Sequence, residues 1–134
     1  MKYLLDTNIC IYLIKKQPAR VFEKFKTHRI GDIGISSITY SELAYGVANS
    51  QHVEQNHLAL EEFVAPLEIV DYPAAAALHY GRMRAELRKK GLLLGPLDML
   101  IASHAAFLGC ILVTNNTSEF SRVPELTIEN WTTT

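Results

Sequence analysis

The stretch that decides the fold is Lys2-Tyr3-Leu4-Leu5-Asp6-Thr7-Asn8, where a short apolar run stops directly at an acid. An apolar run of this length is typical of a buried β-strand. Asp6, Thr7 and Asn8 are N-cap residues, and we expect a helix to follow them as far as about Lys16. In a parallel sheet, residues just beyond the carboxyl end of a strand line the ligand site. Asp6 is therefore the first candidate functional residue.

The same strand–helix unit recurs along the chain. We expect further strands over residues 33–36, 67–70 and 110–114, and an edge strand near 126–128. Helical patterns occupy the segments between them, over residues 18–28, 37–49, 51–65, 73–90 and 97–108, with a short turn of helix near 117–120. The strands are apolar runs without period-two alternation, which is typical of a parallel sheet covered by helices on both faces. The sequence therefore predicts an α/β fold.

Composition limits the class of protein. The chain has 134 residues, 49% of them hydrophobic, which suits one domain with its own core and excludes disorder. No apolar run approaches the roughly 18 residues that a membrane-spanning helix needs, and the apolar start is too short for a signal peptide. Cys10 and Cys110 do not make a disulfide framework, and two buried thiols fit a reducing cytoplasm. We expect a single cytoplasmic domain over residues 1–134.

Three otherwise isolated acids lie near predicted strand ends and helix starts, and a polar cluster follows the last buried strand. The acids are Asp6, Glu42 and Asp98, and the cluster is Thr114-Asn115-Asn116-Thr117-Ser118-Glu119-Phe120. Each feature has a simpler explanation. Asp6 and Asp98 suit helix N-caps, Thr39 to Glu42 matches a capping box, and the last cluster suits a polar turn.

Taken together, the acids indicate a metal site. Carboxylates that converge repel one another and raise each other's pKa unless a cation lies between them. Mg²⁺ takes oxygen ligands from a few carboxylates and keeps several of its waters. An ion held in this way polarises a phosphoryl oxygen and holds a water for in-line attack. The pattern therefore predicts metal-assisted hydrolysis of a phosphodiester.

Four motifs, in family order and at similar spacing, give the chain its resemblance to a known family. They are Asp6-Thr7-Asn8, Ser36 to Leu43 followed by Tyr45-Gly46, Gly95-Pro96-Leu97-Asp98 followed by Ile101-Ala102, and Leu112 to Asn116 ending at Glu119-Phe120. From residue 1 to about Trp131 the chain resembles PIN-domain ribonucleases, and more narrowly the VapC toxins of bacterial toxin–antitoxin pairs. The resemblance implies a single PIN domain: a three-layer sandwich with a central parallel sheet of about five strands flanked by helices.

The resemblance also implies an activity and partners. A VapC toxin would be a Mg²⁺-dependent, or Mn²⁺-dependent, endoribonuclease that inhibits translation. The subgroup that the chain resembles most cleaves the anticodon loop of initiator tRNA, so we expect that tRNA as the substrate. We expect a cognate VapB-type antitoxin as the partner. The slight apolar excess of the chain also favours a homodimer and a higher toxin–antitoxin assembly.

Carried over residue by residue, Asp6, Glu42 and Asp98 match the three central acids of the family's metal site. The chain departs from the family at the fourth position, where many members have Asp and this chain has Asn116. We expect Glu119 as the fourth acidic, catalytic member and Asn116 as a neutral metal ligand or hydrogen-bond partner. The number of metal ions stays open: one alternative is that the acids bind a single Mg²⁺ tightly and that a second ion arrives with the RNA. Supporting roles around the ligands suit Thr7, Asn8 and Thr114.

The net charge of −1 does not exclude RNA, because the charges are unevenly placed. Residues 1–29 hold seven bases, residues 30–81 hold none, and residues 82–90 hold five. Basic segments can therefore hold phosphates beside an acidic metal site. Four of the bases on the predicted helix over residues 73–90 cannot all share one face, so only some of Arg82, Arg84, Arg88 and Lys89 would reach the RNA. The candidates for RNA binding are Lys15, Lys16, Arg82, Arg84, Arg88 and Lys89.

Two alternatives stay open at this point. Asn116 in place of an acid allows a catalytically impaired PIN-like domain that binds RNA or a partner without cutting it. A response-regulator-like domain would need a second acid beside Asp6 and a lysine after the last buried strand, and the chain has neither.

His104 lies in an apolar helical segment, and we interpret it as a core or interface histidine because no second histidine has the spacing of a zinc site.

Overall fold

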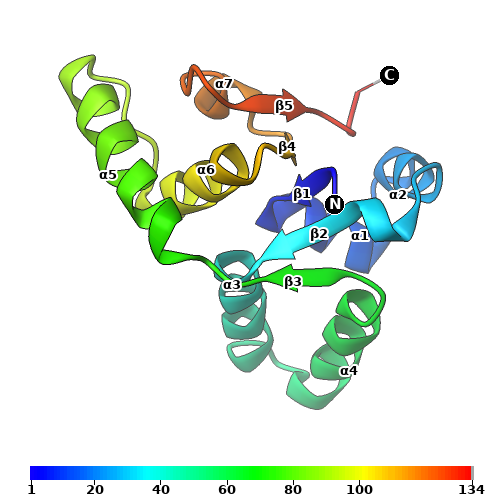
Figure 1. Cartoon of the computed structure of the whole chain (residues 1–134). Helices are drawn as coiled ribbons and strands as arrows, with labels where there is room; N and C mark the ends of the chain where they lie inside the picture. Colours follow the sequence, from blue (N-terminus) through cyan, green and yellow to red (C-terminus); the bar gives the residue numbers. More distant parts are fainter. Residues whose placement is uncertain (134) are drawn as a thin grey trace.

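The computed structural model describes residues 1–133 and contains a five-stranded sheet in the order β3-β2-β1-β4-β5 (Figure 1). All neighbouring strands pair in parallel. The prediction of an α/β fold with about five parallel strands is therefore confirmed. The strands are β1 (Tyr3–Leu5), β2 (Ile33–Ser36), β3 (Glu68–Val70), β4 (Ile111–Val113) and β5 (Thr127–Glu129).

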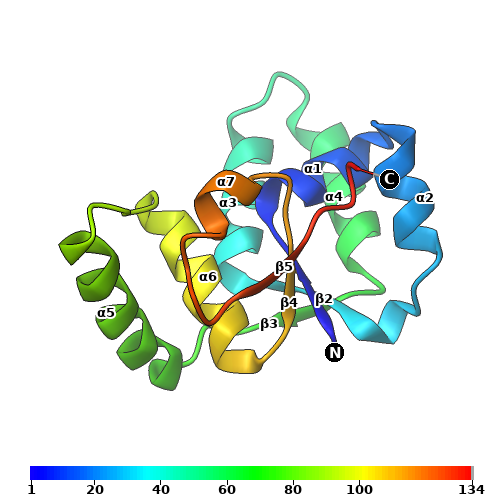
Figure 2. The same ribbon diagram turned by 90° about the horizontal axis from the view of Figure 1, so that it is seen from above.

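The connections between the strands are helical. They are α1 (Thr7–Lys15), α2 (Ala19–Lys26), the 3₁₀ turn η1 (Ile30–Asp32), α3 (Ser37–Ala48), α4 (Val53–Val64), α5 (Ala74–Lys89), α6 (Pro96–Leu108) and α7 (Thr117–Phe120). Figures 1 and 2 both show α5 and α6 on one side of the strands, and α1, α2 and α4 on the other. The molecule is thus a three-layer sandwich of helices, sheet and helices.

Local sequence explains where several helices begin and end. The side chain of Asp6 caps α1, and α1 stops at Lys16, whose backbone is left-handed with φ 56°. Pro96 occupies the first position of α6, where a missing N–H costs nothing. Gly109 ends α6 in the left-handed region at φ 69°, a conformation that glycine adopts without steric penalty.

The sheet separates two hydrophobic clusters, and alternate strand residues enter each of them. Leu5, Ile35 and Val113 pack in one cluster with side chains from α1 to α4. Leu4 and Leu112 pack in the other, with side chains from α5, α6 and α7. Because successive side chains of a strand point to opposite faces, burial of both faces makes each strand an unbroken apolar run.

The strand order places a topological switch point between β1 and β4. The chain first adds β2 and β3 on one side of β1, and then returns to add β4 and β5 on the other side. In open α/β sheets, ligands bind at such a point, in the crevice beyond the carboxyl ends of the strands. Leu5 pairs with Val113 at the ends of the two strands. Asp6 and Thr114, the next residues, therefore lie at the switch point.

The predicted elements are confirmed with boundaries that agree to within two residues. The 3₁₀ turn at Ile30–Asp32 was not predicted. Cys10 and Cys110 are buried free thiols, as expected. Among the described residues, none of the helices combines the length and the apolar character that crossing a membrane requires.

Candidate metal centre

Asp6 combines a capping role with a place at the switch point. One carboxylate oxygen accepts a 2.9 Å hydrogen bond from the backbone N–H of Ile9, and so caps α1. The backbone N–H of Asp6 donates to the carbonyl of Val113 at 3.0 Å, which ties the start of α1 to the end of β4. The side chain is only 5% exposed. Capping fixes the carboxylate in place and leaves its second oxygen free of that bond.

The charge of Asp6 is held at an energetic cost. Burial raises the pKa of its carboxyl from 3.8 to about 6, against the hydrogen bonds from Thr114 and Ile9, which lower it. The negative charges of Asp98 and Glu42 add to the rise. A carboxylate that is buried beside other carboxylates is stabilised by a cation. Asp6 therefore has the electrostatics of a metal ligand.

Glu42 reaches the site from α3, and the capping box, its simpler explanation, does not form. The N-cap of α3 is Ser36, whose hydroxyl accepts from the N–H of Ile38 at 3.0 Å. Glu42 therefore lies well inside the helix, where no free backbone N–H is within its reach. Its carboxylate instead accepts a 2.6 Å hydrogen bond from the hydroxyl of Thr7. This bond holds Glu42 beside the start of α1.

Asp98 lies in the first turn of α6, and the N-cap role, its simpler explanation, does not apply either. The N-cap is Gly95, and no side chain caps this helix. Asp98 is half-buried, and burial is the largest cause of its raised pKa. The negative charges of Glu119 and Glu42 raise that pKa further. Asp98 therefore faces the other acids across the carboxyl edge of the sheet.

The polar segment after β4 brings Asn116 and Glu119 together. The hydroxyl of Thr114 accepts a 2.9 Å hydrogen bond from the backbone N–H of Asn116. The side-chain amide of Asn116 donates to the carboxylate of Glu119 at 3.1 Å. Because Asn116 brings an amide donor in place of a negative charge, it lowers the repulsion around Glu119 while holding that carboxylate in place.

The structure thus brings the four selected acids to the same edge of the sheet, and within residues 1–133 none of them forms an ion pair. Ion pairs of the described residues involve Glu23, Glu61 and Glu125. No three acidic, histidine or cysteine side chains in that range are gathered tightly enough to hold an ion directly. An all-oxygen group this open fits a hard divalent cation that keeps several of its waters.

The three supporting residues behave differently. Thr7 donates to Glu42, and Thr114 hydrogen-bonds to Asp6 and to the backbone of Asn116. Asn8 is exposed, and within the described part of the chain no hydrogen bond joins its side chain to the acids. The structure therefore places Thr7 and Thr114, but not Asn8, in direct contact with the site.

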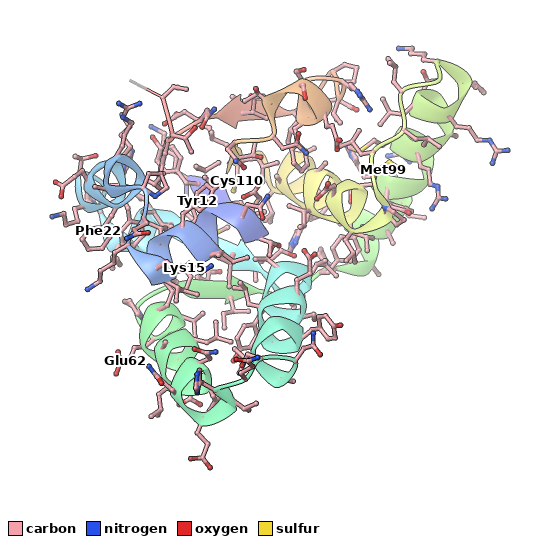
Figure 3. The ribbon with its side chains drawn as sticks, turned by 180° about the vertical axis from the view of Figure 1, so that it is seen from behind. Tyr12, Lys15, Phe22, Glu62, Met99 and Cys110 are labelled. Carbon is pink, nitrogen blue, oxygen red and sulfur yellow. The ribbon has the colours of Figure 1, made fainter. Side chains whose placement is uncertain are left out.

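The end of α1 carries Lys15, which is labelled in Figure 3, and Lys16 is the C-cap residue that follows it. Lys15 lines a pocket of about 310 Å³ together with Glu42, Leu43 and residues of α4. The ammonium of Lys16 lies 5.5 Å from the centre of the Phe22 ring on α2. The left-handed backbone at Lys16 turns the chain here, so the two neighbouring lysines serve different surfaces.

The basic residues of α5 divide between two faces of the helix, as expected. Arg82 and Lys89 line a pocket of about 470 Å³ that also includes Glu86 and Glu125. Arg84 points elsewhere and donates a 2.8 Å hydrogen bond to the hydroxyl of Tyr80, one turn earlier. Arg88, one turn after Arg84, is exposed.

Two polar contacts near the site were missed by sequence reasoning. The amide of Asn115 donates to the hydroxyl of Tyr12 at 3.0 Å, which joins the segment after β4 to α1. The Nδ1 atom of His104 lies 2.8 Å from the hydroxyl of Ser36. His104 is indeed a core histidine, since it is fully buried. Its partner lies 68 residues away in sequence, and no local pattern indicates such a pair.

Comparisons with known proteins agree with this geometry. The PIN domain family matches residues 3–126. A tRNA(fMet)-specific endonuclease VapC from Shigella flexneri is 50% identical over 131 residues, which cover 98% of each chain. The VapC ribonucleases are thus similar to this chain along nearly its whole described length.

Two solved structures are similar as well. VapBC from Salmonella typhimurium, bound to DNA, superposes with a TM-score of 0.92 at 45% identity, covering 98% of each chain. VapBC2 from Rickettsia felis, bound to a DNA fragment from the promoter, superposes with a TM-score of 0.90 at 46% identity, covering 98% of this chain and 99% of the other. With this fold, this carboxylate edge and these relatives, the chain belongs to the PIN-domain family, within the VapC ribonucleases.

Proposed function

We propose that the chain is the toxin of a toxin–antitoxin pair and acts as a metal-dependent endoribonuclease that hydrolyses RNA phosphodiester bonds. The observation that carries the proposal is the meeting of Asp6, Glu42, Asp98 and Glu119 at the switch point, where none of them forms an ion pair among the described residues. The relatives named ribonuclease or endonuclease support the same reaction. The whole of residues 1–134 would act as one PIN domain.

The metal that fits best is Mg²⁺, with Mn²⁺ as a substitute. Asp6, Glu42 and Asp98 would hold it through carboxylate oxygens, in part by way of the waters that the ion keeps, and the amide oxygen of Asn116 would be a neutral donor. When bound, the ion would supply charge stabilisation to the phosphate under attack. The all-oxygen donor set favours these ions over zinc, which prefers nitrogen and sulfur.

The residues of the chain prepare the site before any ion arrives. Ile9 and Thr114 fix the Asp6 carboxylate, and Thr7 fixes that of Glu42. We assign the fourth acidic place to Glu119, which Asn116 orients through its amide. Carboxylates that are already ordered lose little side-chain entropy when an ion binds. The hydrogen bonds around the site therefore favour metal binding.

We infer that the substrate is initiator tRNA, cut in its anticodon loop, so that cleavage inhibits translation. The support is the relative from Shigella flexneri, whose name gives that tRNA, at 50% identity. Lys15 lines the same pocket as Glu42, and we assign it a phosphate contact. Arg82, Arg84, Arg88 and Lys89 offer a second basic region on α5, while we assign Lys16 to packing on Phe22.

We further infer a VapB-type antitoxin as the partner, together with a homodimer and a higher assembly in the cytoplasm. Relatives of known structure are VapBC complexes. The pocket between α1, α3 and α4 is mostly apolar and opens beside Glu42, which suits an antitoxin segment that carries a basic side chain. Its apolar lining includes Ile11, Ile14, Leu43, Val47 and Leu60.

The proposal is tested with the purified chain and with cells. The protein should cut RNA with Mg²⁺ and lose this activity in EDTA or as Asp98→Asn, while keeping its circular dichroism spectrum. Expression should arrest growth, and co-expression of a cognate VapB-type antitoxin should relieve the arrest. RNA cleavage that survives both EDTA and Asp98→Asn would refute the metal site.

A second candidate function follows from Asn116. A domain that lacks the fourth Asp of the family could bind RNA or a partner without cutting it. The two candidates separate in one calorimetric experiment. The nuclease should bind Mn²⁺ at the acids. A scaffold that had lost the site should bind no Mn²⁺ there, so its affinity for RNA should be the same in the presence and absence of Mn²⁺.

A further inference from the structure

The contact between His104 and Ser36 links two of the helices that carry acids. His104 lies on α6, six residues after Asp98, which is about 9 Å along the helix axis. Its Nδ1 atom shares a 2.8 Å hydrogen bond with the hydroxyl of Ser36. Ser36 is the N-cap of α3, and α3 carries Glu42. One hydrogen bond therefore joins the helix of Asp98 to the helix of Glu42.

Further contacts hold the imidazole ring against the start of α3. The ring of Tyr72 meets that of His104 edge to face, with the ring centres 5.2 Å apart. The backbone N–H of Tyr72 donates to the hydroxyl of Ser37 at 3.0 Å, and its own hydroxyl shares a 2.9 Å hydrogen bond with Ser103. The network thus spans the end of β2, the segment before α5, and α6. It is contiguous and mostly buried.

Burying the imidazole of His104 here costs more free energy than burying an apolar side chain of similar size. His104 is fully buried, and burial lowers its pKa, so the ring is neutral and carries one proton. Nδ1 has Ser36 as its partner, but Nε2 has no hydrogen-bond partner among the described residues. A buried polar atom without a partner is destabilising, whereas an apolar side chain of similar size would pack without that cost. What the ring offers and leucine does not is its bond to Ser36.

The hydrogen bond between His104 and Ser36 orients the N-cap residue of α3. The Ser36 hydroxyl accepts from Ile38 N–H at 3.0 Å and also meets His104, so its rotamer is set by partners on two elements. With the hydroxyl fixed, the first turn of α3 is fixed relative to α6. Glu42, in the second turn of α3, is then held at a defined distance from Asp98, whose pKa responds to its charge.

We propose that His104 is a positioning residue of the acidic site: through the Ser36 hydroxyl it sets the spacing between Glu42 on α3 and Asp98 on α6. It touches neither substrate nor metal. This proposal rests on the proposed function, because the spacing matters only if both acids serve one ion. In proteins, residues that orient metal ligands typically change metal affinity by 10- to 100-fold when replaced.

The test uses the whole RNA-free chain and two substitutions of His104. His104→Leu removes the hydrogen bond, and His104→Asn keeps a polar amide near the place of Nδ1. Ile101→Val is the matched control, because it is a buried change on the same helix that leaves the polar network intact. If the leucine variant does not fold, His104→Gln replaces it, since its longer side chain carries the amide toward the Nε2 position instead.

Two readouts are measured for each variant: Mn²⁺ affinity by calorimetry, and the amide hydrogen-exchange rate of Ile38, which donates to Ser36. We expect His104→Leu to weaken Mn²⁺ binding by about 10- to 100-fold and to speed exchange at Ile38. His104→Asn should restore both values to near those of the parent chain, and Ile101→Val should change neither. The proposal is overturned if His104→Leu matches the parent chain in both readouts, or if His104→Asn loses as much as His104→Leu.

Failure of the proposed function is a different result. It would appear as a parent chain that binds no Mn²⁺, and the exchange rate of Ile38 would then decide on the link alone. Faster exchange in His104→Leu but not in His104→Asn or Ile101→Val supports the link between α6 and α3. An unchanged exchange rate in His104→Leu overturns it.

Discussion

The hydroxyl of Thr7 donates a 2.6 Å hydrogen bond to the carboxylate of Glu42, and so joins the helix after β1 to the helix after β2. Glu42 is therefore held in place before an ion or substrate binds. The two residues lie 35 positions apart in sequence, and only the parallel arrangement of β1 and β2 brings them together.

The first prediction concerns this bond. Thr7→Val keeps the shape of the side chain and removes the donor, so Glu42 becomes free to move away from Asp6. We expect kcat to fall by about 10-fold or more, as for other residues that orient metal ligands. The loss of one hydrogen bond should lower the free energy of unfolding by only about 1 kcal/mol. Steady-state cleavage and urea denaturation measure the two effects.

Thr7→Ser is the control for that experiment, because it keeps the hydroxyl and removes only a methyl group. It should retain most of the activity. Equal loss in the serine and valine variants would mean that the methyl group, and not the hydrogen bond to Glu42, matters at this position.

The second prediction concerns pH. The pKa of Asp6 is about 6 in the folded protein and 3.8 ordinarily, so the folded state holds this proton more tightly than the unfolded chain does. The contribution of Asp6 therefore favours folding at low pH and is lost as pH rises from about 4 to about 6. At about 1.4 kcal/mol for each pH unit, the loss is about 3 kcal/mol above that window.

Asp6→Asn should remove this dependence, because asparagine can still cap α1 and carries no charge. At pH 7.5 and without divalent ions, the variant should be more stable than the parent chain by up to about 3 kcal/mol, although it should not cut RNA. Thermal melts from pH 4 to 8 measure the difference. A variant that is less stable than its parent above pH 6 would show that the Asp6 carboxylate is not under electrostatic stress.

Much of the site could be predicted because it depends on residues that are close together in the sequence. Asp6 follows an apolar run, and in a parallel sheet that placement alone puts it at the carboxyl edge. The distant pairings could not be predicted in the same way. Ser36 and His104 meet only because α6 packs against α3, and Glu42 meets Thr7 only through the pairing of β1 with β2.

Helix ends show a second limit of sequence reasoning. Both Ser36 and Thr39 suit an N-cap, and the choice depends on where β2 stops, which the sheet decides. The divergence of Lys15 and Lys16 has a similar origin. It depends on the left-handed backbone at Lys16, a conformation that lysine rarely adopts and that its sequence context does not indicate.

The third prediction distinguishes Glu119 from Asn116. If Glu119 is the fourth acid, Glu119→Gln should lower cleavage by about 10- to 100-fold and weaken Mn²⁺ binding. Asn116→Ala removes the 3.1 Å hydrogen bond but leaves the carboxylate, so its effect should be smaller. Parallel calorimetry and cleavage assays measure both variants. The reverse order of effects would assign the fourth place to Asn116.

The fourth prediction concerns the two lysines at the end of α1. Lys15→Ala should raise KM for RNA severalfold with little change in kcat, because a phosphate contact positions the substrate and does no chemistry. The salt dependence of binding should also become shallower by about 0.7 in slope for a contact to single-stranded RNA. Binding measured from 50 to 300 mM KCl gives that slope.

Lys16→Ala is the matched control, because its ammonium lies over Phe22 and not in the pocket of Glu42. We expect its KM and its salt slope to stay near those of the parent chain. If Lys16→Ala and Lys15→Ala weaken RNA binding equally, the RNA crosses the end of α1 and contacts both lysines.

The central claim is that four acids at the switch point form the metal site of a tRNA-cleaving nuclease. The most direct measurement incubates the purified chain with total tRNA and Mg²⁺ and maps the new RNA ends, with Asp98→Asn and EDTA as controls. We predict a single cut in the anticodon loop of initiator tRNA, absent in both controls. Intact tRNA in the presence of Mg²⁺, or the same cut made by the Asp98→Asn variant, would contradict the account.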